Sequence, residues 1–489
     1  MYNNNCFESI TPESAGIASK DIAAFLSALQ ENKINIQGYM LLRYNKLLSS
    51  GIAFPYRFTD KRHVYSISKC FTSTAIGMAV DEGLLSPEDT VLSFFPEWAP
   101  KNPSQNLKDM RIRHLLCMGS GHAKDTIEPM LSSHDNWVKT FLSLTVEHTP
   151  GTFFVYNSGA SYMLSAILQK VTGQNLSEFL TPRLFEPLNI TGIVWDKSPQ
   201  DICIGGWGLH ISMDDMAKLG LLYLNKGIWQ GRRLLSENWI STATSAVVSN
   251  ADNKDTEDAD WRHGYGYHFW RCRHNCYRGD GAYGQYIIVS PDKDMVAVII
   301  SETNRMQKVL DLFWEKLYCK ISDTALEPNS LDDTLLKLKA DSMVCNKIEQ
   351  SPIIQHPYHQ SFSAEENPFN ITKLTLNVKS RSCFITIQST DKRIFEIGCE
   401  KSKWTYLNEK SFPISPVSGV FDIYKNSDAT IAAAYYWKSI SLLIIKMQFV
   451  DSPHAVTFKL NLASDKNTVS VQKSTDPDSA KRTWQLNIV

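Results

Sequence analysis

The hydrophobic and polar positions of this 489-residue chain follow a helical period in some segments and a strand period in others. Ile22, Phe25 and Leu29 fall on one face of a helix predicted over residues 16–30. The stretch "GYMLLRYNKLLSSGIA" predicts a hairpin, because two apolar runs flank a turn at residues 44–46. Residues 67–83 are apolar on nearly all sides, which predicts a buried helix.

A helix- and loop-rich region is predicted from about residue 85 to residue 245. Within it, a helical pattern ends at Gly173, and Ser212 is the expected N-cap of a second helix. From residue 264 to 300, short apolar runs separated by turn residues predict an antiparallel meander. Residues 304–321 then predict a closing helix.

The C-terminal part of the chain has a different pattern. The chain is polar and weakly helical around residues 325–350, and short alternating segments beyond them predict strands. A chain of this length exceeds a single hydrophobic core. We therefore expect an α/β domain at residues 1–325 with a helical subdomain inserted at about 85–245, a linker at 326–354, and an all-β barrel or sandwich at 355–489.

Composition and charge narrow the classes of partner and compartment. The net charge is −1 and no basic run stands out, so neither nucleic acid nor an anionic membrane is expected as a partner. No stretch approaches 18 consecutive apolar residues, the N-terminus has no secretory pattern, and the ten cysteines are scattered. These features predict a cytoplasmic protein, and they leave its oligomeric state open.

One short motif, Ser66-x-x-Lys69, opens the predicted buried helix. Residues three apart on a helix are neighbours, and a serine hydroxyl becomes a useful nucleophile when a base accepts its proton. Lysine can be that base when burial lowers its pKa. The motif alone is weak, because residues 389–392 and 470–473 also match it. Only Ser66 precedes a helix, and this context favours a nucleophile over an ordinary serine at a helix start.

Two further segments contain candidates for catalysis. Tyr156 lies just before a predicted helix, where its hydroxyl can pass a proton between Ser66 and a leaving group. The alternative is a core or cap tyrosine. In "RGDGAYGQYIIVS" three glycines let a strand edge approach a ligand, and the backbone N–H of Ala282 can join that of Ser66 in an oxyanion hole. The alternative there is a glycine-rich hairpin.

Histidine and cysteine are concentrated between His263 and Cys276. Cys272, His274 and Cys276 would share one face of a strand, but their spacing matches no common zinc pattern. We expect a hairpin with Cys272 and Cys276 opposed near its turn, and neither a metal nor another cofactor.

Five stretches, in this order, resemble the serine β-lactamase and penicillin-binding-protein superfamily, in its class C and family VIII esterase branch. They are "YSISKCFTSTAIGMAVDEGLLSPEDTVLSFFPEW", "IRHLLCMGSGH", "PGTFFVYNSGASYMLSAILQKVTG", "ISMDDMAKLGLLYLNKGIWQGRRLLSENWI" and "YRGDGAYGQYIIVSPDKDMVAVII". The resemblance implies a β-lactamase/transpeptidase-like fold, in which an antiparallel sheet flanked by helices meets a helical subdomain at the active site. It also implies Ser66 as the acylated nucleophile, Lys69 as its base and Tyr156 as the proton shuttle.

The second motif departs from the family's pattern. The family usually has Tyr-x-Asn, whose asparagine orients the lysine and donates to the substrate, and here the motif is Tyr156-Asn157-Ser158. Ser158 is shorter than asparagine, and Asn157 points elsewhere on regular geometry. Both are kept as candidates for substrate binding.

The third motif departs as well. The family usually has Lys-Thr-Gly or a histidine-containing variant, and Gly279-Asp280-Gly281 aligns with it here. Asp280 in place of the cation is expected to repel a substrate carboxylate, unless Arg278 compensates, and to pair with a substrate ammonium. The alternative is that Asp280 caps a turn. Gly279, Asp280 and Gly281 complete the set of candidates for substrate binding.

The leading prediction is therefore a serine hydrolase that cleaves a small ester, amide or short peptide through a covalent acyl-enzyme on Ser66. Efficient β-lactam turnover is not expected. One alternative is a D-aminopeptidase, a DD-peptidase or a β-lactamase in the narrow sense. Another is a binding or scaffold protein that kept the fold and lost the chemistry, which Ser158 and Asp280 favour mildly and the intact Ser66, Lys69 and Tyr156 oppose.

Overall fold

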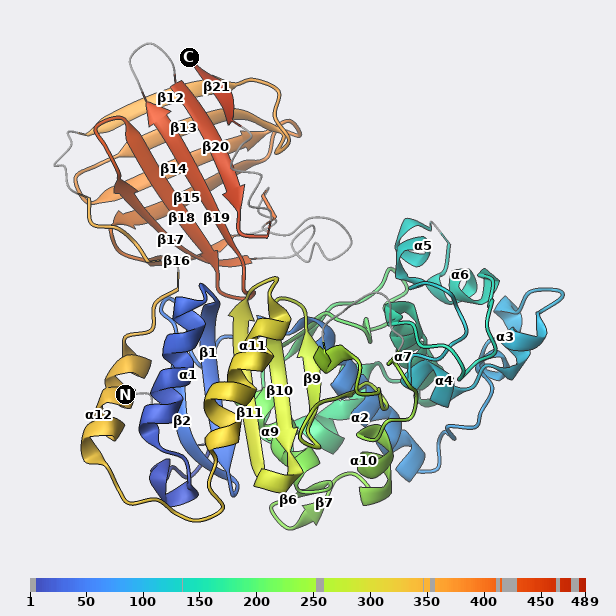
Figure 1. Cartoon of the computed structure of the whole chain (residues 1–489). Coiled ribbons are helices and arrows are strands. Elements are labelled where there is room, and N and C mark those ends of the chain that lie inside the picture. The colour runs from blue at the N-terminus through green and yellow to red at the C-terminus, as the bar shows by residue number, and fades with distance from the viewer. Residues whose placement is uncertain are drawn as a thin grey trace. The chain divides into compact units, whose positions relative to one another are not determined.

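The computed structural model divides the chain into two units (Figure 1). The first contains Met1–Ala53 and Phe58–Met343, and the second contains Phe54–Arg57 and Val344–Val489. The structure describes residues 6–133, 135–251, 259–345, 347–351, 357–409, 414–415, 429–462, 467–475 and 483–489. Because Phe54–Arg57 belongs to the second unit, the chain passes between the units more than once.

A six-stranded antiparallel sheet is the centre of the first unit. Its strands follow the order β2 (Lys46–Ile52), β1 (Asn35–Arg43), β11 (Met295–Glu302), β10 (Gln285–Ser290), β9 (Tyr277–Gly281) and β8 (Trp270–Arg271). Strands β9, β10 and β11 are buried almost throughout, which explains the apolar runs of β10 and β11. The predicted meander and the predicted hairpin of β1 and β2 are both confirmed.

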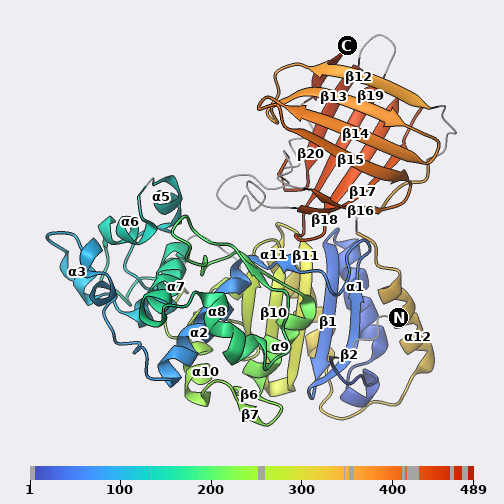
Figure 2. The ribbon, with the colours of Figure 1, turned by 180° about the vertical axis from the view of Figure 1, so that it is seen from behind.

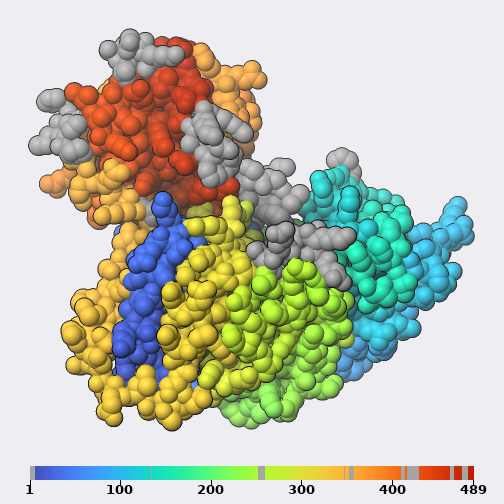
Figure 3. Space-filling view, in the orientation of Figure 1, coloured from blue at the N-terminus to red at the C-terminus, as the bar shows by residue number. Residues whose placement is uncertain are grey.

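Helices cover both faces of this sheet (Figures 1 and 2). On one face lie α1 (Ser19–Glu31) and α11 (Met306–Leu312), and on the other α9 (Met213–Leu224) and α2 (Ser68–Asp81). In the space-filling view α1, in blue, lies between α11 and α12 (Ser330–Asp341) (Figure 3). Helix α12 therefore packs in the first unit, although the sequence placed its residues in a linker.

The helical region joins the sheet through α2. Its helices are α3 (Gln105–Asp109), α4 (Ile112–Leu116), α5 (Ile127–Ser132), α6 (Trp137–Ser143), α7 (Ser158–Thr172), α8 (Leu176–Leu180) and α10 (Glu237–Ala243). Small sheets lie beside them: β3 (Arg62–His63), β5 (Leu209–Ile211) and β4 (Val194–Trp195) form one, and β6 (Ile228–Trp229) and β7 (Arg232–Arg233) the other. None of the helices in the described part of the chain has both the length and the apolar composition that crossing a membrane requires.

Local signals explain where several helices begin and end. Ser212 caps α9 in a capping box with Asp215, as predicted. Helix α7 ends at Gly173, whose φ of 70° favours glycine. The predicted closing helix is interrupted, because α11 stops at Leu312 and a π-helical turn follows over Phe313–Leu317.

The second unit is a closed barrel, not a sandwich. Its strands are β12 (Tyr358–Ala364), β13 (Ile371–Val378), β14 (Ser382–Ser389), β15 (Ile394–Lys401), β16 (Thr405–Glu409), β17 (Ala429–Trp437), β18 (Leu442–Phe449), β19 (Ala455–Leu462), β20 (Asn467–Lys473) and β21 (Thr483–Ile488). They form one sheet that closes where β15 pairs with β17. Apolar side chains of alternate positions, such as Ile445 and Phe458, fill the interior, so the barrel has a packed core.

Packing around α2 gives a test of the fold. A Cβ atom at Gly77 would lie 2.5 Å from the Trp239 ring, so we expect Gly77→Ala to destabilise the first unit. Overpacking costs about 1–3 kcal/mol, which outweighs the gain of up to about 1 kcal/mol in helix propensity. Urea unfolding, detected through hydrogen exchange of the α2 amides, measures the change in the free energy of unfolding. In a Trp239→Leu background the same substitution should be neutral or stabilising, and an equal loss in both backgrounds would contradict the packing explanation.

Candidate active site

Ser66 and Lys69 meet at the start of α2. Ser66 lies in the 3-10 turn η2 (Tyr65–Ile67) that leads into the helix, and Lys69 follows within the first helical turn. The Nζ atom of Lys69 is 3.1 Å from Oγ of Ser66. Ser66 is half-buried, whereas Lys69 is 1% exposed. The geometry therefore brings together a hydroxyl that can receive a substrate and a nitrogen base that water does not reach.

Two other acceptors surround the Lys69 nitrogen. It donates to the carbonyl oxygen of Gly206 at 2.8 Å and to Oγ of Ser158 at 3.3 Å. Burial lowers the pKa of Lys69 to about 7, and the negative charge of Asp125 opposes this shift most strongly among its charged neighbours. A neutral amine has two N–H donors and one lone pair, so Lys69 can donate to these two acceptors and accept the Ser66 proton.

Tyr156 completes the cluster. Its hydroxyl hydrogen-bonds to Ser66, and its ring centroid lies 4.6 Å from Nζ of Lys69. The ring also stacks on Trp270, with centroids 5.4 Å apart and an interplanar angle of 23°. Burial raises the pKa of Tyr156 above its ordinary value of 10. At neutral pH the side chain is therefore a phenol, which can give and take a proton but does not carry a charge.

Ser158 and Asn157 have different places although they are adjacent. Ser158, at the first position of α7, faces Lys69 as described above. Asn157 is the N-cap of α7: its Oδ1 accepts hydrogen bonds from the amide of Ala160 and from the amide and hydroxyl of Thr126. Asn157 is fully buried, so the structure does not bring it into the cluster around Ser66.

The sequence analysis missed Asp125 and Gly206. Oδ1 of Asp125 accepts the backbone amides of Ile127 at 3.0 Å and of Ser158 at 2.9 Å, which ties the start of α5 to the start of α7. Asp125 thus fixes the residue that contacts Lys69, and its charge acts on the lysine directly. No local sequence pattern marks Asp125 as a site residue. The adjacent glycines Gly205 and Gly206, in contrast, indicate a segment of backbone that another side chain can approach closely.

Strand β9 lies against the turn that carries Ser66. A Cβ atom at Gly279 would lie 2.8 Å from Sγ of Cys70, and one at Gly281 would lie 2.4 Å from the carbonyl oxygen of Val64. These glycines therefore let the strand approach the start of α2. Ala282 follows directly after β9, and its amide as an oxyanion donor stays a prediction.

Asp280 and Arg278 form a buried ion pair on the same face of β9. Nε and Nη2 of Arg278 are each 2.9 Å from Oδ2 of Asp280. Asp280 is 7% exposed. Burial raises the pKa of Asp280 to about 6, against the opposing effect of Arg278. Asp280 thus lies within a strand rather than at a turn, and its carboxylate has an internal cation as its partner.

The histidines and cysteines between His263 and Cys276 make separate contacts. His268 contacts the Lys69 carbonyl through Nδ1 at 3.0 Å, and His274 stacks on Tyr318. Cys272 and Cys276 face each other across a turn, where the amide of Cys272 donates to the carbonyl of Cys276. They lie in a hairpin of the predicted kind.

A different group offers ligand atoms for a metal. Among the described residues, His63, Asp196 and His210 place such atoms within 4.8 Å of one another, on or beside strands β3, β4 and β5. Two imidazoles and a carboxylate suit a borderline cation such as Zn²⁺. Nε2 of His63, however, accepts the Gly208 amide at 3.2 Å.

The fold and the cluster together define a class of protein. A serine and a lysine one helical turn apart, at the start of a buried helix beside an antiparallel sheet, are typical of the Ser-x-x-Lys enzymes. The family model Beta-lactamase matches residues 51–315, more than half of the chain. The chain belongs to this family.

Similar proteins of the family are hydrolases. The 6-aminohexanoate-dimer hydrolase of Paenarthrobacter ureafaciens is 24% identical over 288 residues, which cover 54% of this chain and 71% of that protein. The lovastatin esterase of Penicillium rubens is 26% identical over 203 residues, 34% of this chain and only half of that protein. These relatives indicate a hydrolase of the β-lactamase-like superfamily.

A solved structure supports the fold. EstCE1, a hydrolase with promiscuous acyltransferase activity, aligns with a TM-score of 0.50 and 16% identity over 60% of this chain and 99% of its own. At this identity the likeness concerns the fold alone.

The lowered pKa of Lys69 gives a test that needs no substrate. Between pH 7 and 10.5 the unfolded chain holds this proton and the folded chain does not, so the free energy of unfolding should rise with pH. Lys69→Met should remove that contribution, which reaches about 1.4 kcal/mol per pH unit. Urea unfolding at several pH values, followed in α2, measures the slopes. Lys20→Met, at an exposed position of α1, is the control, and equal slopes for wild type and Lys69→Met would refute a neutral lysine.

Proposed function

We propose that this protein is a serine hydrolase that cleaves a small ester or amide through an acyl-enzyme on Ser66. The observation that supports this most directly is the Lys69 nitrogen, 3.1 Å from the Ser66 hydroxyl and buried so that its pKa falls to about 7. A base whose pKa lies near neutrality accepts a proton efficiently at physiological pH. An exposed serine beside an ordinary lysine would lack this property.

The first half of the reaction forms the acyl-enzyme. Lys69 takes the Ser66 proton while Oγ bonds to the substrate carbonyl carbon, and the carbonyl oxygen gains negative charge. In this proposal the amides of Ser66 and Ala282 stabilise that charge. Tyr156 then relays the proton to the departing alcohol or amine as its bond to the carbonyl carbon breaks.

The second half releases the acid. Water attacks the ester carbonyl of the acyl-enzyme, and the cluster accepts one proton from it. Oγ of Ser66 leaves with a proton returned from the cluster, which restores the serine hydroxyl and the neutral amine of Lys69. Each step needs Tyr156 as a neutral phenol, in keeping with its raised pKa.

The substrate class follows from the relatives and from the charges. The 6-aminohexanoate-dimer hydrolase and the lovastatin esterase favour small substrates for this chain too. The Asp280 carboxylate is paired with Arg278, so a substrate ammonium would have to compete with that guanidinium. The pair also leaves no extra cation for a penicillin carboxylate at this position. We therefore favour, over a β-lactam, an ester or amide whose binding needs no charged group to pair with Asp280 or Arg278.

The central prediction concerns Ser66. Ser66→Ala should reduce turnover of p-nitrophenyl butyrate by at least about 10³-fold and abolish the mass increase that a fluorophosphonate produces on the intact protein. Ser389→Ala is the matched control, because it removes the serine of a second Ser-x-x-Lys match, which begins at the last residue of β14. An adduct of equal yield on Ser66→Ala would overturn the assignment. A penicillin tested in parallel should give little or no adduct.

The pH dependence of acylation tests Asp125 as a positioning residue. The acylation rate should rise with pH through an apparent pKa near 7, because only neutral Lys69 accepts the proton. Asp125→Asn keeps the oxygen that accepts the α7 amides but removes the charge that raises the Lys69 pKa. The rising limb should therefore move to lower pH in stopped-flow measurements. Glu128→Gln, an exposed neighbour, should leave it in place, and an unmoved limb in Asp125→Asn would contradict this role.

A further inference from the structure

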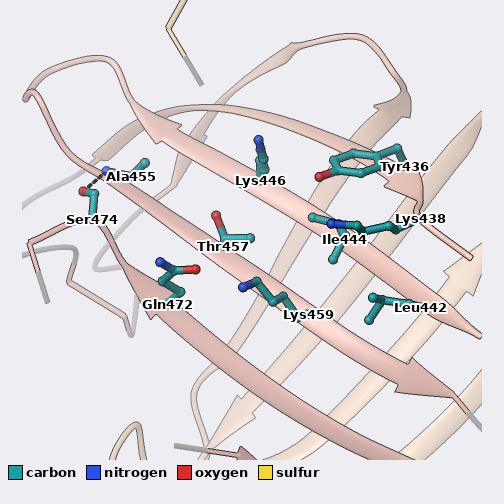
Figure 4. A pocket seen from close by; sticks show the side chains of 10 residues that line it. All are labelled: Tyr436, Lys438, Leu442, Ile444, Lys446, Ala455, Thr457, Lys459, Gln472 and Ser474. Carbon is teal, nitrogen blue, oxygen red and sulfur yellow. Dashed lines mark hydrogen bonds between the residues drawn. The ribbon is translucent and has the colours of Figure 1, made fainter. Parts of the chain in front are cut away.

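A pocket of about 450 Å³ lies on the outer face of the barrel (Figure 4). Tyr435 and Trp437 of β17 point into the barrel core, so their neighbours Tyr436 and Lys438 lie on the opposite face. The lining comes from β17, β18, β19, β20 and the turns that follow them, and it includes Lys438, Lys446, Lys459, Tyr436, Thr457 and Gln472. Ile444 and Ala455 add an apolar part.

The pocket contains three ammonium groups and no carboxylate among its lining residues. Strand register explains their proximity: Lys446 pairs with Thr457, and Lys459 follows two residues later on the same face. Diagonal neighbours of this kind are about 7–8 Å apart. Figure 4 shows Lys446, Thr457, Lys459 and Gln472 on neighbouring strands. No ion pair within the described ranges of the chain involves any of the three lysines.

Like charges held together on a sheet repel one another. At Lys446 burial is the main cause that lowers the pKa, the Glu349 carboxylate opposes it, and Lys438 and Lys459 lower the pKa further by smaller amounts. Its Nζ donates to the carbonyl of Lys347 at 2.9 Å, which satisfies one N–H but supplies no negative charge. A bound anion would offset this repulsion and use donors that Thr457 and Gln472 also provide.

We propose that this pocket binds a small organic anion with two or more negative charges, carried by carboxylate or phosphate groups, beside a short apolar portion. The concave shape and limited volume favour a small molecule over an extended polyanion, which would need a basic stripe across the surface. The site lies within the second unit and is independent of the proposed hydrolase chemistry.

Calorimetric titration of the full-length chain tests the proposal, with citrate and inorganic pyrophosphate as separate probes in 150 mM NaCl. We expect one of them to bind with a stoichiometry of about one, and the better probe tells whether carboxylate or phosphate is preferred. Lys459→Gln and Lys438→Gln should each weaken that binding about tenfold, the usual effect of losing one charge-assisted contact. Lys373→Gln, an exposed lysine on β13, should change it less than about twofold.

Three results would overturn the proposal. The first is the absence of binding by both probes at millimolar concentration. The second is binding that Lys459→Gln and Lys438→Gln leave unchanged, which would place the anion elsewhere. The third is an equal loss in Lys373→Gln, which would indicate general attraction to surface charge. Thermal unfolding of each variant without ligand checks that the barrel is intact, and activity toward p-nitrophenyl butyrate should be unaffected in all three.

Discussion

The burial of a single amino group, that of Lys69, is the constraint on which the arrangement of the first unit depends. A lysine withdrawn from water is tolerated when its nitrogen has acceptors and its charge can be given up. Gly206 and Ser158 supply the acceptors from two segments far from Lys69 in the sequence. The place of α2 in the core therefore depends on contacts with α7 and with the loop before β5.

The same constraint explains the small residues around α2. An amine this deep needs its neighbours close, and larger side chains at Gly279 or Gly281 would push β9 away from the turn that carries Ser66. Burial also weakens Lys69 as a base, and Asp125 offsets part of that effect. Its charge keeps the lysine from becoming too weak a base, while its hydrogen bonds to the start of α7 hold Ser158 in reach. Solvation, electrostatics and packing therefore act on one nitrogen atom.

Much of the fold could be predicted from the sequence, because many of its elements depend on residues that are close together in the chain. The hairpin of β1 and β2, the capping box at Ser212 and the buried helix after Ser66 each depend on residues a few positions apart. The π-helical turn after Leu312 has no such local signature. The place of α12 beside α1 likewise depends on tertiary packing. The α12 segment is polar and only weakly periodic, so its sequence does not indicate which element it packs against.

The candidate site was predictable to a similar degree. Ser66 and Lys69 share a helical turn, and Arg278 and Asp280 share one face of a strand, so both pairs could be foreseen. Asp125 and Gly206 come to Lys69 only through the fold, and nothing local marks Asp125. The sequence position of Asn157 favours a structural role over substrate binding, because asparagine directly before a helix is a common N-cap.

The segment Phe54–Arg57 shows that the barrel is more than an appended domain. This loop leaves the first unit after β2, and the hydroxyl of Tyr56 donates to the carbonyl of Ser452 at 3.0 Å and accepts from Gln448. The amide of Cys345 in turn donates to the carbonyl of Phe54. A polypeptide cut after Met343 would therefore keep the loop but lose every one of these partners. The two units are interleaved in sequence, and neither can be obtained as a native piece by a single cut.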